Sequence, residues 1–190
     1  MSLTVEKCLQ AWTNSLKQMN AKANIVFFGD SLIYYGDFAS VFPDKVVCNL
    51  GLRGDTLQGM KNRVEQVMLL EPEKVYMMAG INDVAVITVD EFKKQYESLV
   101  MALKKQCPFT KLTVFNMLPV NVEDFSISCN NEQILRANEE IASLCINQNV
   151  DCIDLYNVYV QSGKLPKEMS MDGIHLKPSS YSLWKQSLSY

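Results

Sequence analysis

The sequence predicts an α/β protein in which a parallel sheet of five strands lies between two layers of helices, a three-layer α/β/α sandwich. Three observations support this fold class. Short apolar runs alternate along the chain with longer segments in which apolar residues recur every three or four positions. Such alternation is typical of parallel sheets that are covered on both faces. The 190 residues also contain no linker, repeat or low-complexity segment, so we expect one domain over residues 1–190.

Each expected element depends on its own pattern. The expected strands are short apolar runs, at 24–29, 45–49, 73–80, 111–118 and 151–155. Four expected helices carry an apolar stripe at helical spacing, at 3–19, 56–70, 130–147 and 178–189. A fifth begins at the capping box Thr-Val-Asp-Glu of residues 88–91 and stops before Pro108. The loop of residues 119–129 is the only stretch without clear periodicity.

Charge and hydropathy exclude several classes of partner. The chain has 18 basic and 21 acidic residues, a net charge of −3, and no basic block, so we expect neither nucleic acid nor an anionic membrane as a partner. No apolar run approaches the ~20 residues that span a bilayer. The N-terminus lacks the apolar core of a signal peptide, so we expect a cytoplasmic protein or one whose leader has been removed. The sequence leaves the oligomeric state open.

The six cysteines are expected to be buried, reduced thiols. They lie at positions 8, 48, 107, 129, 145 and 152, with no Cys-x-x-Cys spacing and no histidine nearby. Several fall in apolar strand or helix patterns, where a free thiol behaves as a small apolar side chain. We therefore expect no metal site.

The single histidine of the chain, His175, follows Asp172 by three residues. Far upstream, Ser31 lies in Gly-Asp-Ser-Leu, directly after the first expected strand. A serine becomes a nucleophile when a base takes its proton, and the usual base is a histidine oriented by a carboxylate. The order Ser, Asp, His along the chain is that of hydrolases built on α/β sheets. Two simpler interpretations remain: Ser31 as a helix cap, and His175 as a surface residue.

Glycine and polar residues follow the expected strands at their carboxyl ends, where sites form in such sheets. The segments are Gly-Asp-Ser-Leu at 29–32, Asn-Leu-Gly-Leu-Arg-Gly-Asp-Thr at 49–56, Gly-Ile-Asn-Asp at 80–83 and Pro-Val-Asn at 119–121. With Asp-Gly-Ile-His at 172–175, this pattern resembles the SGNH hydrolases, also called GDSL esterases and lipases. The resemblance covers nearly the whole chain and implies a flavodoxin-like sheet, with no metal and no cofactor.

The resemblance also implies roles for single residues. Ser31 is the expected nucleophile, His175 its base, and Asp172 the carboxylate that orients the histidine. The oxyanion hole is expected to consist of the backbone N–H groups of Ser31 and Gly54 and the side-chain amide of Asn82. Asn82 also suits a turn, with Asp83 bonded locally. Asp30 and Asp55 are expected to hold nearby backbone N–H groups.

Three residues distinguish the expected pocket. Arg53 precedes Gly54 where the family more often has a small residue, and it either attracts an anionic substrate at the pocket mouth or lies on the surface. Ile33 and Tyr34, two and three residues after the serine, are bulky and are expected to narrow the site.

The resulting expectation is a serine esterase that cleaves a small-molecule ester through an acyl-enzyme on Ser31. Similarity to small bacterial acylhydrolases of the platelet-activating-factor acetylhydrolase and sialate O-acetylesterase sort favours a short acyl group, such as acetyl on a carbohydrate. The alternatives are a lysophospholipase or thioesterase with a longer acyl pocket, a catalytically silent carbohydrate-binding protein on the same scaffold, and a flavodoxin-like nucleotide binder. Bulky residues and Asp30 after the first strand oppose the last of these. Acyl transfer to an acceptor other than water stays open.

Overall fold

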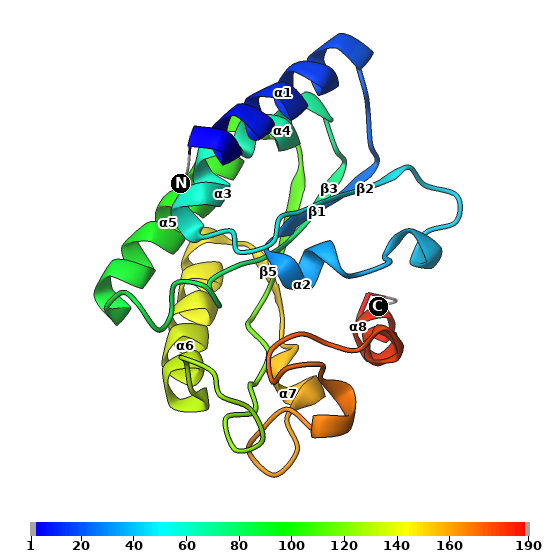
Figure 1. Ribbon diagram of the computed structural model, residues 1–190. Helices are drawn as coiled ribbons and strands as arrows, with labels where there is room; N and C mark the ends of the chain where they lie inside the picture. Colours follow the sequence, from blue (N-terminus) through cyan, green and yellow to red (C-terminus); the bar gives the residue numbers. More distant parts are fainter. Residues whose placement is uncertain (1–2, 189–190) are drawn as a thin grey trace.

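The computed structural model describes residues 3–188 and contains a sheet of five parallel strands in the order β2-β1-β3-β4-β5 (Figure 1). The strands are β1 Ile25–Gly29, β2 Val47–Gly51, β3 Lys74–Met78, β4 Lys111–Phe115 and β5 Asp151–Ile153. At the carboxyl edge, Gly29 of β1 lies opposite Gly51 of β2 and Met78 of β3. The loops that follow these three strands therefore meet at one edge of the sheet.

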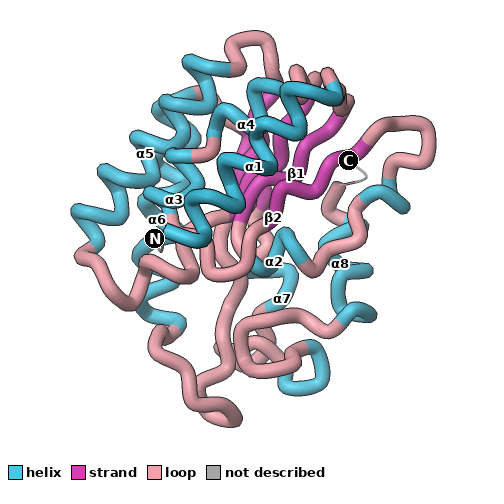
Figure 2. The backbone as a smooth tube through the Cα atoms, turned by 45° about the horizontal axis from the view of Figure 1, so that its top comes forward, coloured by secondary structure: helices cyan, strands magenta, loops and turns pink. Residues whose placement is uncertain are grey.

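The two faces of the sheet are covered by different helices, because successive strand residues point to opposite sides. Val26 and Phe28 pack against the long helices, whereas Ile25 and Phe27 pack against short ones. The first face carries α1 Leu3–Met19, α3 Leu57–Asn62, α4 Val64–Leu69, α5 Val89–Gln106 and α6 Asn131–Gln148. The second carries α2 Ser31–Tyr34, α7 Tyr156–Tyr159 and α8 Tyr181–Gln186 (Figures 1 and 2). The predicted three-layer α/β/α fold is confirmed.

Local sequence signals explain where the long helices begin. The Thr88 hydroxyl accepts a hydrogen bond from Glu91 N–H at 3.2 Å, which satisfies one of the free N–H groups at the start of α5. At α6, Asn130 and Gln133 form a reciprocal capping box that the sequence prediction did not identify.

Several predicted elements differ from the observed ones. The single helix predicted for residues 56–70 is two helices, α3 and α4, separated at Arg63, whose φ of −117° and ψ of 18° are not helical. The second strand lies two residues later than predicted because its pairing with β1 continues to Gly51. The segment at 178–189 is a 3₁₀ turn, Pro178–Ser180, followed by α8, and its last residue lies outside the described residues. Four further short elements were not predicted, since three or four residues carry no periodicity: α2, α7 and the 3₁₀ turns Ala39–Val41 and Lys167–Met169.

The prediction for the cysteines is correct only in part. All six are free thiols, but only Cys129 and Cys145 are buried, and Cys8 and Cys152 are exposed. Cys152 lies on β5, an edge strand, and is therefore less covered than a central strand residue. Within residues 3–188, no group of three or more His, Cys, Asp and Glu side chains is arranged to hold a metal ion. None of the helices in this part of the chain has the length and apolarity needed to cross a membrane.

Candidate active site

Ser31 is the first residue of α2, and a single residue, Asp30, separates it from the end of β1. The Asp30 side chain caps this helix by accepting a hydrogen bond from Leu32 N–H at 2.9 Å. On the far side of the helix, the Asn49 side chain donates to the carbonyl of Ile33 at 2.8 Å and to that of Gly36 at 3.0 Å. The short helix is thus tied to β1 and β2, so the position of Ser31 does not depend on the helix's own weak stability.

Three predicted residues from distant parts of the sequence form a chain of contacts. His175 Nε2 lies 2.8 Å from Ser31 Oγ, and His175 Nδ1 lies 2.6 Å from Asp172 Oδ2. Ser31 is almost completely buried, whereas the His175 side chain is about 25% exposed. The imidazole therefore reaches the serine from the open side of the site.

The loop that carries Asp172 and His175 is closed by its own hydrogen bonds. Asp172 Oδ1 accepts from the N–H groups of Ile174 at 3.1 Å and His175 at 2.8 Å. The Ser170 hydroxyl donates to the His175 carbonyl at 3.0 Å and accepts from Gly173 N–H at 2.8 Å. Partial burial raises the pKa of Asp172, but these N–H groups and the His175 ring outweigh it and hold the pKa below its ordinary value. Asp172 is therefore a carboxylate at neutral pH.

The predicted oxyanion-hole residues come from the loops after β1, β2 and β3. Gly54 has a φ of +70°, a left-handed conformation that other residues adopt at a cost, and a Cβ there would point into open space. Asn82 donates from Nδ2 to the carbonyl of Asp55 at 2.8 Å, which fixes its amide beside the residue that follows Gly54. Asn82 keeps partial exposure. These loops lie at the same edge of the sheet as Ser31.

A sequence-family model for GDSL-like lipases and acylhydrolases matches residues 27–183, more than four fifths of the chain, including the four motif blocks that contain Ser31, Gly54, Asn82 and His175. The chain belongs to the GDSL-like lipase/acylhydrolase family. The members of this family are enzymes that hydrolyse acyl ester bonds, and this chain is one of them. No curated protein matches it in sequence.

Solved structures with the GDSL fold are similar over nearly the whole chain. A candidate platelet activating factor from Streptococcus pneumonia superimposes with a TM-score of 0.82 at 22% identity, covering 99% of this chain and 98% of its own. A GDSL-like lipase from Bacteroides thetaiotaomicron gives 0.78 at 19% identity, covering 95% and 94%. An acetyl xylan esterase gives 0.70 at 20% identity, covering 87% and 99%. At these identities the similarity establishes the shared fold.

Of the three residues expected to line the pocket of this GDSL protein, two are exposed and one is buried in the core. Tyr34 and Arg53 are exposed, and the Arg53 guanidinium lies 5.7 Å from the centre of the Tyr35 ring. Tyr35 in turn lies edge-on to His175, with ring centres 5.5 Å apart. The prediction for Ile33 is wrong: its side chain is fully buried in the core between α2 and the sheet, where it cannot contact a substrate.

Three residues support the site although the sequence analysis gave them no role: Asn49, Asn121 and Tyr35. Asn49 opens the second block and holds α2, as described above. Asn121, in Pro-Val-Asn, is fully buried, and its N–H donates to the Gly173 carbonyl at 2.9 Å, which anchors the loop of Asp172 and His175. Tyr35 carried no signal in the sequence. Asp83 bonds at long range and not locally as predicted, since it accepts from Leu57 N–H at the start of α3 at 3.1 Å.

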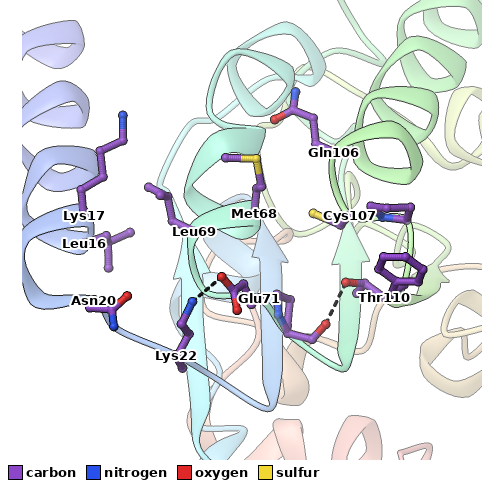
Figure 3. Close-up of a pocket in the computed structure, with 13 residues that line it drawn as sticks. Leu16, Lys17, Asn20, Lys22, Met68, Leu69, Glu71, Gln106, Cys107 and Thr110 are labelled. Carbon is purple, nitrogen blue, oxygen red and sulfur yellow. Dashed lines mark hydrogen bonds and ion pairs between the residues drawn. The ribbon is translucent and has the colours of Figure 1, made fainter.

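A cleft of about 580 Å³ lies at the other end of the sheet, near the amino ends of the strands (Figure 3). Side chains from the ends of α1, α4 and α5 surround it, and the exposed side chains of Lys22 and Glu71, which also line it, form an ion pair. None of the predicted site residues of this GDSL protein lines it. We therefore place the candidate active site at the carboxyl edge, where the polar groups converge.

Proposed function

We propose that this protein is a serine esterase that cleaves a carboxylic ester through an acyl-enzyme on Ser31. The observation that carries the proposal is the continuous contact from Ser31 Oγ to His175 and from His175 to Asp172, at 2.8 and 2.6 Å. Each distance is within the range for direct proton exchange. With one histidine in the chain, the assignment of the base has no competitor of the same type.

The proposed reaction has two steps. Ser31 Oγ attacks the acyl carbonyl while His175 Nε2 takes its proton, and the protonated histidine then gives that proton to the leaving alkoxide as the ester C–O bond breaks. A water molecule then attacks the acyl-enzyme with His175 again as base, which releases the acid and restores Ser31. The Asp172 carboxylate keeps Nδ1 protonated and stabilises the imidazolium that forms in both steps.

The negative oxygen of each tetrahedral intermediate needs donors that are already in place. The backbone N–H groups of Ser31 and Gly54 and the Asn82 amide are the proposed donors. The capping of α2, the left-handed φ of Gly54 and the bond from Asn82 to Asp55 support this assignment, because each fixes a donor before substrate arrives.

A short acyl group on a polar alcohol is the proposed substrate, with an acetyl ester of a carbohydrate as the main candidate. One similar structure is that of an acetyl xylan esterase, which is compatible with this choice. The exposed rim formed by Tyr34, Tyr35 and Arg53 supports it too, since aromatic rings and a guanidinium suit a sugar better than a long alkyl chain.

The test is hydrolysis of p-nitrophenyl acetate, butyrate and octanoate by the wild-type protein, by Ser31→Ala and by the control Ser179→Ala, which alters an exposed serine. We expect kcat/KM to fall with acyl length, activity to be lost in Ser31→Ala, and Ser179→Ala to match the wild type. A preference for octanoate would favour a lysophospholipase or thioesterase. Wild-type activity that survives in Ser31→Ala would refute the proposed nucleophile, and absence of any ester hydrolysis would favour the silent binding protein.

A further inference from the structure

Arg63 is a buried cation beneath the carboxyl edge of the sheet. Only 3% of the residue is exposed, and its guanidinium lies 4.4 Å from the centre of the Phe28 ring. Removing such a charge from water is costly unless every N–H finds an acceptor. The position of Arg63 therefore needs an explanation that the apolar core alone does not supply.

The guanidinium donates three hydrogen bonds to three different segments. Nε donates to Asp55 Oδ2 at 2.6 Å, one terminal nitrogen to the Leu50 carbonyl at 2.8 Å, and the other to the Gly29 carbonyl at 2.9 Å. Gly29 ends β1, two residues before Ser31, and Leu50 lies near the end of β2. Asp55 directly follows Gly54. One side chain thus joins the segment of the nucleophile to the loop of the oxyanion hole.

The same network extends to the third proposed oxyanion donor. The carbonyl of Asp55 accepts the hydrogen bond from Asn82 Nδ2 at 2.8 Å, and its side chain also accepts from Thr56 N–H at 3.0 Å. Fixing Asp55 therefore fixes both the peptide after Gly54 and the amide of Asn82. The hydrogen bonds of Arg63 go to Asp55, Leu50 and Gly29, and not to the three proposed oxyanion donors or the three triad residues.

The backbone conformation at Arg63 is consistent with a side chain that must reach three separate acceptors. The helix predicted from the apolar stripe is interrupted here although neither glycine nor proline is present at the break, which leaves α3 and α4 as separate six-residue helices. Only a guanidinium, whose three nitrogens lie in one rigid plane, can donate at the same time to acceptors on three different segments. A lysine ammonium carries its donors on one atom and cannot span the same acceptors.

We propose that Arg63 is a positioning residue for the oxyanion hole, which acts by holding the strand ends of Gly29 and Leu50 and the loop of Gly54 and Asp55 in fixed relative positions. This inference assumes the serine-esterase function proposed above. We expect Arg63 to affect kcat and not KM, because the oxyanion develops in the transition state and the tetrahedral intermediate, whereas the ground-state ester has no such charge to stabilise.

The experiment compares wild type, Arg63→Lys and the control Arg136→Lys, which alters an arginine that pairs with Glu132 on the exposed face of α6. Steady-state kinetics on p-nitrophenyl acetate are measured at least 15 °C below each melting temperature, so that every variant is folded. Binding of an alkyl boronic acid, which forms a tetrahedral anion on serine, is measured in parallel. Misplacement of catalytic groups by about 1 Å costs up to about 10²-fold.

We expect Arg63→Lys to lower kcat by about 10- to 100-fold with KM within about threefold of wild type, and to weaken boronic acid binding by a similar factor. Arg136→Lys is expected to match the wild type in kcat, in KM and in its affinity for the boronic acid. A folded Arg63→Lys with wild-type kcat overturns the proposal. So does a loss of activity that appears only in KM, or one that leaves the affinity for the boronic acid unchanged.

If Arg63→Lys does not fold, Asp55→Asn serves in its place. The amide keeps the size of the side chain but removes the charge that Arg63 Nε contacts, and the same pattern of reduced kcat and boronic acid affinity is expected; its absence overturns the proposal. The proposed function fails separately, because wild-type protein without Ser31-dependent hydrolysis refutes the esterase before any Arg63 variant is compared.

Discussion

The two ends of the sheet differ in how their polar groups are used. At the amino end, the cleft of Figure 3 is large, but its charged groups pair at the surface, as Lys22 does with Glu71 and Lys17 with Glu65. At the carboxyl edge, the buried side chains of Arg63 and Asp55 bond to each other and to backbone groups of Gly29, Leu50 and Thr56. Exposed ion pairs contribute little to stability or order. Buried networks fix positions closely.

The difference indicates that volume alone is a poor guide to the site in this fold. The amino end offers space without converging donors, whereas the carboxyl edge offers donors aimed by a rigid scaffold. In parallel sheets this asymmetry is general, because loops that leave the carboxyl ends of adjacent strands meet there. We therefore expect substitutions at the carboxyl edge to lower activity more than substitutions at the amino end.

The largest effect is expected for His175→Ala. It removes the only histidine of the chain and leaves Ser31 without a base, so we expect kcat to fall by about 10⁴-fold or more, close to the loss in Ser31→Ala, because residues that act as a unit are not additive. Steady-state ester hydrolysis measures it. The matched change at the amino end, Gln106→Ala in the cleft, is expected to keep kcat within about twofold. Substantial activity in His175→Ala would disprove the triad.

A smaller loss is expected for Asn82→Ala. Removal of one oxyanion donor costs about 10²–10³ in kcat with little change in KM. The control is Asn62→Ala, at the exposed end of α3, where the side chain accepts only a surface hydrogen bond from Gln58. A rise in KM at constant kcat would instead assign Asn82 to substrate binding.

The smallest effect is expected at Asp30 and concerns the pH dependence of the free energy of unfolding. Asp30 is fully buried, and its pKa is raised to about 7. Burial is the main cause, and the nearby Asp55 and Asp83 add to it, whereas the hydrogen bond from Leu32 N–H and the charge of Arg63 oppose it. Between about pH 4 and pH 7 the folded protein keeps a proton that the unfolded chain has released, so the free energy of unfolding falls as pH rises and levels off above 7.

Asp30→Asn is neutral at every pH and can still accept from Leu32 N–H, so it is expected to flatten this decline. In the wild type, Asp30 is expected to lower the free energy of unfolding by about 2–3 kcal/mol between pH 5 and pH 8, at about 1.4 kcal/mol per pH unit. Urea unfolding at both pH values measures it. Asp55 and Asp83, whose pKa values burial also raises, keep part of the slope in the variant. Equal slopes in wild type and variant would contradict the assignment.

Much of this molecule was predictable because its patterns are local or lie in short blocks. Apolar periodicity identified all five strands and the long helices, and the motif blocks identified Ser31, Asp172 and His175, which lie in contact across 144 residues of sequence. What was missed depends on tertiary contacts. Ile33 lies two residues after the serine, yet the turn of α2 directs its side chain into the core and leaves Tyr35 beside the histidine.

Arg63 illustrates the same limit at the centre of the site. In the sequence it is one charged residue beside an apolar helical stripe, where an exposed position is the default. Its three acceptors, at Gly29, Leu50 and Asp55, lie 34, 13 and 8 residues away, and two of them are backbone carbonyls that no residue pattern encodes. Only the assembled sheet edge brings them together.

Because the chain has one histidine and that residue contacts both Ser31 and Asp172, the protein has a built-in spectroscopic label. A single imidazole contributes every histidine ring signal in a proton or nitrogen NMR spectrum of the intact protein. Tautomer, protonation and exchange with solvent can then be followed at the candidate site without isotopic editing or mutation. Acylation of the serine, binding of an inhibitor and movement of the loop at 170–176 would each be recorded in the same resonances.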